Sequence, residues 1–144
     1  MPWAYFDTSA LIKRYVDEEG RREVLRLLRS HDVVTSAVLP LELRSALRRR
    51  VTEGTVDGTG AENVMKRVTT DRVYWTLIPA GNEVLAAAES LVSAHPLRAL
   101  DAIHLASAQL FAAGMPMTEL IFVSADIRQA EVAMKVGMKT RQIR

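Results

Sequence analysis

The chain has 144 residues, of which 49% are hydrophobic, with no cysteine and a formal net charge of +2. This length predicts one globular domain over residues 1–144, large enough for a core without disulfides or structural metals. The lack of cysteine excludes disulfide scaffolds, zinc thiolate sites and thiol nucleophiles. If cations neutralise several acidic side chains, the remaining surface is more basic than +2 suggests, which favours a polyanionic partner.

The amino terminus shows no targeting pattern. Met1-Pro-Trp-Ala lacks the basic and apolar regions of a secretory signal, and no run of the chain approaches the ~18 apolar residues that span a bilayer. We therefore expect a cytoplasmic protein that is neither secreted nor inserted into a membrane.

The first half of the chain predicts alternating strands and helices. In chain order we expect a strand at 3–6, helices at about 9–16 and 18–30, a strand at 32–36, and a helix at about 37–53. The next seven residues, 54–60, are rich in turn formers and predict a surface loop.

The second half continues the same alternation. We expect a helix at about 61–72, a strand near 74–78, helices at about 82–94 and 97–113 separated by Pro96, a strand at 120–124, a helix at 127–136 and a strand near 139–143. Short strands alternating with helices predict an α/β fold with a mostly parallel sheet covered on both faces.

Two acidic residues lie on helix faces that are otherwise apolar. Glu42 lies beside Leu39 and Leu43 on the apolar stripe of its helix, and Asp101 lies beside Leu105 on the stripe of a later helix. An ionised carboxylate on a core-facing stripe costs several kcal/mol unless it is paired or binds a metal. Something in the fold must therefore compensate both charges.

Two further acidic residues directly follow predicted strands. Asp7 comes after the strand at 3–6, and Asp126 comes after the strand at 120–124. Open parallel sheets bind ligands at the carboxyl ends of their strands. Together with Glu42 and Asp101, these residues predict one acidic site.

Helix capping is a simpler interpretation of the strand-end acids. Asp126 followed by Gln129 is typical of an N-cap with its capping-box partner. Asp7, Thr8 or Ser9 could equally cap the helix that follows the first strand. Capping alone would require no metal at either position.

Ion pairing is the simpler interpretation of the helical acids. Glu42 could pair with Arg44 or Arg48, and Asp101 could pair with Arg98. Each of these local explanations is reasonable alone. Four such coincidences together are a weaker explanation than one shared site.

The residue types of the acidic site favour a hard divalent cation. Carboxylate oxygens without thiolates or a second nearby histidine suit Mg²⁺ or Mn²⁺ better than zinc. Such a cation activates water and orients a phosphodiester, so the predicted reaction is metal-assisted phosphodiester hydrolysis. The hydroxyls of Thr8, Ser9 and Ser124 would orient the carboxylates or the water.

Basic residues near the acidic positions are candidates for binding a nucleic-acid backbone. They are Lys13, Arg14, Arg44, Arg48, Arg49 and Arg50. A solvated helix face is the alternative interpretation of this cluster. His104, one turn after Asp101, could be a ligand or general base, but we expect a packed histidine that makes a hydrogen bond.

Four separated motifs carry a resemblance to a known family. They are Asp7-Thr-Ser-Ala-Leu-Ile-Lys-Arg-Tyr15, Leu41-Glu42-Leu-Arg-Ser-Ala-Leu-Arg-Arg49, Leu97-Arg-Ala-Leu-Asp101-Ala-Ile-His-Leu-Ala106 and Phe122-Val-Ser-Ala-Asp126. In this order they resemble the successive signatures of PIN-domain ribonucleases, and most of all the VapC-type toxins of toxin-antitoxin pairs. Ser124 stands where many members carry threonine, which keeps the hydroxyl.

The resemblance implies a PIN-like three-layer α/β/α sandwich and a Mg²⁺- or Mn²⁺-dependent endoribonuclease. Its acidic quartet would be Asp7, Glu42, Asp101 and Asp126, all candidate metal ligands and catalytic residues. It also implies RNA targets such as tRNA, rRNA or mRNA, a homodimer, and a cognate VapB-like antitoxin that covers the acidic pocket.

Two other functions remain as alternatives. The first is a catalytically silent PIN-fold module that binds RNA or a protein partner. The second is a magnesium-dependent phosphoacceptor that resembles a receiver domain. The second is disfavoured because Thr35-Ser36, not aspartate, ends the second predicted strand.

Overall fold

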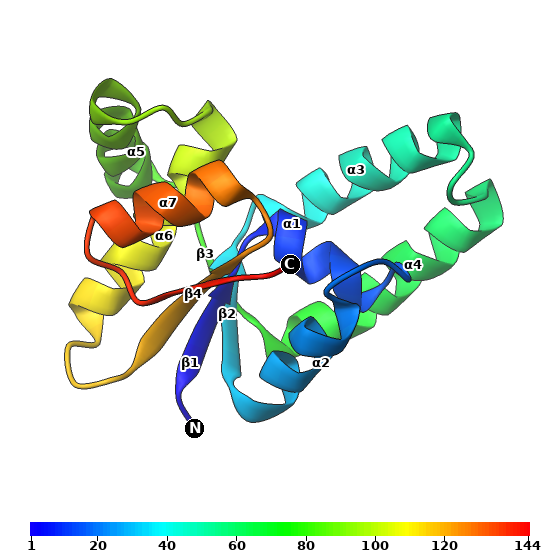
Figure 1. The fold of residues 1–144 in the computed structure, drawn as a ribbon, viewed down its shortest axis with the longest axis horizontal. Coiled ribbons are helices and arrows are strands. Elements are labelled where there is room, and N and C mark those ends of the chain that lie inside the picture. Colours follow the sequence, from blue (N-terminus) through cyan, green and yellow to red (C-terminus); the bar gives the residue numbers. More distant parts are fainter.

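A central parallel sheet organises the computed structural model, which describes residues 1–144 (Figure 1). Its strands are β1 (Trp3–Phe6), β2 (Asp32–Ser36), β3 (Thr76–Ile78), β4 (Leu120–Ser124) and β5 (Thr140–Gln142). They lie in the order β3-β2-β1-β4-β5, and all four neighbouring pairs are parallel. The expected α/β fold with helices around a parallel sheet is confirmed.

Seven α-helices and two 3₁₀ turns connect the strands. They are α1 (Thr8–Leu11), η1 (Ile12–Arg14), α2 (Arg21–Ser30), α3 (Leu39–Glu53), α4 (Gly58–Asp71), η2 (Arg72–Tyr74), α5 (Asn82–Ala94), α6 (Ala99–Gly114) and α7 (Ile127–Lys135). None of these helices has the length and apolarity that crossing a bilayer requires.

Alternating residues of each strand pack into two separate cores. On β1, Ala4 and Phe6 pack with residues of α1 to α4, whereas Tyr5 packs with residues of α5, α6 and α7. Phe122 on β4 joins the Tyr5 side, and its ring stacks on the Tyr5 ring at a centroid distance of 5.4 Å. The sheet is therefore buried on both faces, as parallel sheets usually are.

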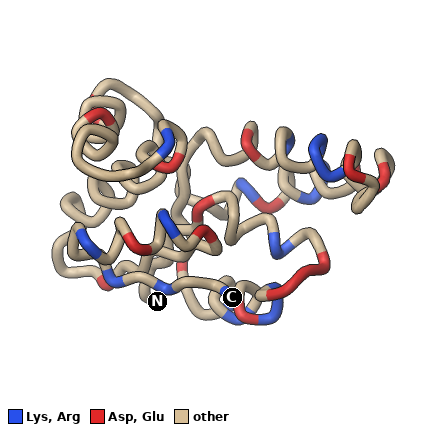
Figure 2. Tube along the Cα trace, turned by 45° about the horizontal axis from the view of Figure 1, so that its top comes forward, with Lys and Arg blue, Asp and Glu red and all other residues tan.

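Helices α3 and α4 form an antiparallel pair that extends away from the sheet (Figure 1). Asp57 caps α4 by accepting a hydrogen bond from the Gly60 amide at 2.6 Å. Because of this cap the helix begins at Gly58, three residues before the expected start, inside the segment predicted as a loop. Figure 2 shows both signs of charge along this arm.

The order in which strands are added to the sheet reverses at β1. From β1 it continues to β2 and β3 on one side, and then returns to β4 on the other side of β1. In open parallel sheets, the gap beyond the carboxyl ends of two such strands is the usual place for a ligand. Asp7 directly follows β1, and Asp126 lies two residues after β4.

Candidate functional site

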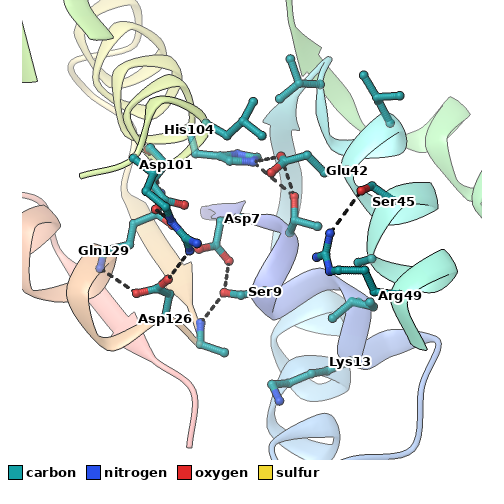
Figure 3. A pocket seen from close by; sticks show the side chains of 18 of the residues that line it. Asp7, Ser9, Lys13, Glu42, Ser45, Arg49, Asp101, His104, Asp126 and Gln129 are labelled. Atoms are coloured by element: carbon teal, nitrogen blue, oxygen red, sulfur yellow. Dashed lines mark hydrogen bonds and ion pairs between the residues drawn. The ribbon is translucent and has the colours of Figure 1, made fainter. Parts of the chain in front are cut away.

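An open pocket of about 1140 Å³ lies at this position of the sheet. All four predicted carboxylates line it: Asp7, Glu42, Asp101 and Asp126. Figure 3 shows them facing a common space from the end of β1, from α3, from α6 and from the loop after β4. The structure thus brings the quartet together, while the role of each member as a metal ligand stays a prediction.

Asp7 is held by hydrogen bonds on both of its carboxylate oxygens. Oδ1 accepts from the Ser9 hydroxyl at 2.7 Å and from the Ala10 amide at 3.0 Å. Oδ2 accepts from the Ser124 hydroxyl at 2.5 Å. The capping interpretation of Asp7 is therefore correct, and the same side chain also lines the pocket.

The electrostatics of Asp7 are unfavourable in the absence of a cation. Burial raises the pKa of Asp7, although the imidazole of His104 and the hydroxyls of Ser124 and Ser9 oppose this shift. Only 1% of the residue is exposed. A buried carboxylate that is costly to ionise is the kind of group that a bound cation stabilises.

Glu42 is fixed by partners from α1 and from α6. Its Oε1 atom accepts from the Thr8 hydroxyl at 2.8 Å and lies 2.5 Å from Nε2 of His104. On the other side of the imidazole, Nδ1 lies 2.8 Å from the Tyr5 hydroxyl. Glu42 makes no ion pair with Arg44 or Arg48, so the local pairing explanation is wrong for this residue.

His104 is a buried histidine with hydrogen-bond partners, as expected, but these partners connect it to the pocket. Its exposed fraction is 1%, and its ring bridges Tyr5 in the core and Glu42 in the pocket. The sequence signal was its position three residues after Asp101, which places both on one helix face.

Asp101 and Asp126 lie close enough to affect each other. Burial raises the pKa of Asp101, the guanidinium of Arg98 opposes this shift, and the negative charge of Asp126 adds to it. Nε of Arg98 lies 3.4 Å from Asp101 Oδ2, and Nη2 of Arg98 lies 3.7 Å from Asp126 Oδ2. The expected Arg98 pair of Asp101 is thus present, and it extends to Asp126.

Gln129 connects the two helices that carry these acids, a role that the sequence did not reveal. The backbone amide of Gln129 donates to Asp126 Oδ1 at 3.1 Å, so Asp126 is the N-cap of α7. The side chain of Gln129 instead donates to the Asp101 carbonyl at 2.9 Å. The amide of Asp126 donates to the Ser124 hydroxyl, so the reciprocal half of the expected capping box is not formed.

The predicted phosphate-contacting residues fall partly outside the pocket. Lys13 lines it, but its ammonium group is bound to Glu18 and to the Glu19 carbonyl. Arg14 pairs with Asp71 and Arg44 pairs with Glu62, and neither lines the pocket.

Helix geometry selects different arginines from the same cluster. Arg48 is exposed and does not line the pocket, whereas Arg49 and Arg50, one and two residues further along α3, do. Arg50 is engaged by Glu18 at 2.6 Å. Arg49 is exposed, with only a 3.2 Å hydrogen bond to Ser45 (Figure 3). Together with the exposed Arg98, it supplies positive charge to the pocket.

The oxygen donors suit a hydrated hard cation rather than a closed metal cage. No three His, Asp or Glu side chains are placed so as to hold a metal ion as they stand. Mg²⁺ usually binds one or two carboxylates, keeps several waters and takes its remaining ligands from substrate phosphates. The neighbouring carboxylates of Asp101 and Asp126, with buried Asp7 in the same pocket, fit that mode.

Comparison with known proteins agrees with this architecture. Residues 4–135 match the PIN domain family. "Ribonuclease VapC35" from Mycobacterium tuberculosis is 30% identical over 140 residues, which cover 93% of this chain and 93% of the relative. The solved structure "Toxin-antitoxin complex from Klebsiella pneumoniae" shares the fold, with a TM-score of 0.64 at 19% identity over 88% of each chain. Since the family match spans most of the sequence, and a ribonuclease relative aligns over nearly all of it, this chain belongs to the PIN-domain family.

Proposed function

We propose that this protein is a Mg²⁺- or Mn²⁺-dependent endoribonuclease of the VapC toxin type. The observation that carries the proposal is the meeting of four carboxylates, from four separate segments, in one pocket at the carboxyl ends of β1 and β4. Its relative VapC35 is a ribonuclease by name, and metal dependence is typical of the PIN family. Exposed arginines at the same rim supply positive charge for an RNA backbone.

In the proposed mechanism, Asp7, Asp101 and Asp126 would hold the cation, directly or through bound water. When bound, the cation lowers the pKa of a water and polarises the scissile phosphate. Glu42 has one oxygen engaged by Thr8 and His104, so its other oxygen is left to orient or deprotonate the water. Ser9 and Ser124 keep Asp7 in its orientation through hydrogen bonds to both oxygens.

The proposal includes the expected partners of such a toxin. A cognate VapB-like antitoxin would cover the acidic pocket, and two copies of the chain would form a homodimer. We expect the RNA substrate to be tRNA, rRNA or mRNA, and the activity to be cytoplasmic.

Cleavage of total cellular RNA by the purified protein tests the function. We expect cleavage in Mg²⁺ or Mn²⁺, none in excess chelator, and a loss of at least a hundredfold in Asp7→Asn and Asp101→Asn. Asp17→Asn is the matched control, because Asp17 is exposed and outside the pocket. Undiminished cleavage in chelator would refute the proposal.

A second readout separates an enzyme from a silent binding module. Expression should arrest bacterial growth, and Asp7→Asn should abolish the arrest while the purified variant keeps its fold. If the wild type binds RNA but neither cleaves it nor arrests growth, the chain is a binding module.

A further inference from the structure

Arg98 occupies an unusual position between two of the carboxylates. It is the N-cap residue of α6, and its side chain is 78% exposed. Its guanidinium reaches both Asp101 and Asp126, at 3.4 and 3.7 Å. Both contacts are longer than a strong charge-assisted hydrogen bond of about 2.8 Å, so the group is attracted to the acids without being locked to them.

Asp101 and Asp126 are two like charges that share one partner. The guanidinium of Arg98 lies within 4 Å of both carboxylates and offsets their mutual repulsion. A divalent cation at the same place would do so with twice the charge. It would also repel the guanidinium, so cation and arginine compete for the same oxygens.

We propose that Arg98 stands in for the divalent cation between Asp101 and Asp126, and that cation binding releases it to contact an RNA phosphate. This inference rests on the proposed function and adds a residue to it. The released side chain remains at the pocket rim, attached to the first turn of α6. Its planar, forked donors match a phosphate, which the acid pair cannot bind itself.

The proposal predicts opposite effects of one substitution on two ligands. In Arg98→Gln the acids lose their competing charge, so Mn²⁺ alone should bind about fivefold more tightly in a calorimetric titration without RNA. In the same variant at saturating Mn²⁺, KM for RNA should rise about fivefold while kcat changes less than twofold. If the substitution only disturbed the local structure, the variant would bind both Mn²⁺ and RNA more weakly.

Two further variants separate the effect of the Arg98 guanidinium's shape and position from the effect of the protein's net charge. Arg98→Lys keeps the charge but not the fork that spans two carboxylates, so its Mn²⁺ affinity should lie between those of wild type and Arg98→Gln. Arg128→Gln is the matched control. Arg128 is exposed in the first turn of α7, close in sequence to Asp126, but it pairs with neither acid.

The outcomes separate this inference from the proposed function. If wild type cleaves RNA with Mn²⁺ but Arg98→Gln binds Mn²⁺ no more tightly, the inference is wrong and the proposed function stands. An equal gain in Arg128→Gln would also overturn it, because the effect would then be one of overall charge. If wild type neither binds Mn²⁺ nor cleaves RNA, both proposals fail.

Discussion

Nε2 of His104 lies 2.5 Å from Oε1 of Glu42, and the two residues are 62 positions apart in the sequence. The Thr8 hydroxyl donates to the same oxygen, and the Tyr5 hydroxyl lies 2.8 Å from the other nitrogen of the ring. One side of the Glu42 carboxylate is therefore anchored in the core. The orientation of its other oxygen in the pocket follows from that anchor.

Removing the imidazole should impair the reaction more than RNA binding. We expect His104→Leu to lower kcat for RNA cleavage about tenfold or more, with KM changed less than threefold, because Glu42 loses its shortest side-chain contact. Tyr5→Phe keeps the contact between His104 and Glu42, so its kcat should fall less. Steady-state kinetics at saturating Mn²⁺ provide the measurement. An unchanged kcat in a folded His104→Leu protein would show that the contact has no part in the reaction.

The elements that local pattern determines were predictable from sequence. Residues 32–36, 82–94 and 120–124 form the expected strand, helix and strand with the same bounds. The first helical region was predicted less well. We expected helices at 9–16 and 18–30, but α1 ends at Leu11 and α2 begins only at Arg21. Gly20 precedes α2 with φ +87°, and a Cβ there would lie 2.4 Å from Ile143 near the other end of the chain. Such a contact leaves no local signal.

In the site too, features with a local sequence signal were predictable, and features that depend on packing between helices were not. The acids on apolar stripes and at strand ends pointed to one pocket because each violated a local rule of burial or lay at a ligand-binding edge. The partnership of Glu42 with His104, and that of Gln129 with the Asp101 carbonyl, depend on how α3, α6 and α7 are packed. Which arginines reach the pocket depends on the rotation of α3 about its axis, which composition does not specify.

Asp7→Asn should abolish cleavage and stabilise the cation-free protein at neutral pH. Burial raises the pKa of Asp7 above its usual 3.8, so the ionised form costs stability at any pH above the raised value. Asparagine keeps an oxygen for the Ala10 amide, and the Ser124 hydroxyl can rotate to accept from the new NH₂ group. We expect a Tm increase of a few degrees at pH 7, at roughly 2–4 °C per kcal/mol.

The pH dependence of the Tm increase in Asp7→Asn tests whether the buried charge of Asp7 is its cause. As pH falls through the raised pKa toward 3.8, wild-type Asp7 becomes neutral in the folded state and the destabilisation disappears. The Tm difference between Asp7→Asn and wild type should therefore be smaller at pH 4 than at pH 7. A Tm difference that stays constant over this range would assign the gain to packing rather than charge.

Divalent cations should stabilise the wild-type fold. A ligand that binds only the folded state at 100 times its Kd adds about 2.7 kcal/mol, which corresponds to a Tm increase of several degrees. Thermal melts in millimolar Mg²⁺ or Mn²⁺ measure this. Asp101→Asn should reduce the shift and Asp17→Asn should not, since only Asp101 lines the pocket. An unchanged wild-type Tm in both cations would contradict a cation site in this pocket.

Asp71, outside the pocket, should respond in the opposite way to Asp7. Its Oδ2 accepts from the Tyr15 hydroxyl at 2.6 Å and from Nε of Arg14 at 3.0 Å, which fastens the end of α4 to the segment after α1. Burial alone would raise the pKa of Asp71, but these hydrogen bonds outweigh it and hold the pKa below 3.8. The charge therefore stabilises the fold above pH 3.8, and this contribution is lost as pH falls through the lowered value.

Asp71→Asn should accordingly lower Tm at pH 7 by about 2–4 °C, for a loss of roughly 1 kcal/mol in a partly exposed, screened pair. The deficit should narrow as pH falls below 3.8, because wild type then loses the same charge. RNA cleavage at 25 °C should stay within twofold of wild type, since Asp71 does not line the pocket. At pH 7, the Tm of Asp7→Asn should therefore lie above that of wild type and the Tm of Asp71→Asn below it. If both variants melted below wild type, burial would not be the dominant cost of the Asp7 charge.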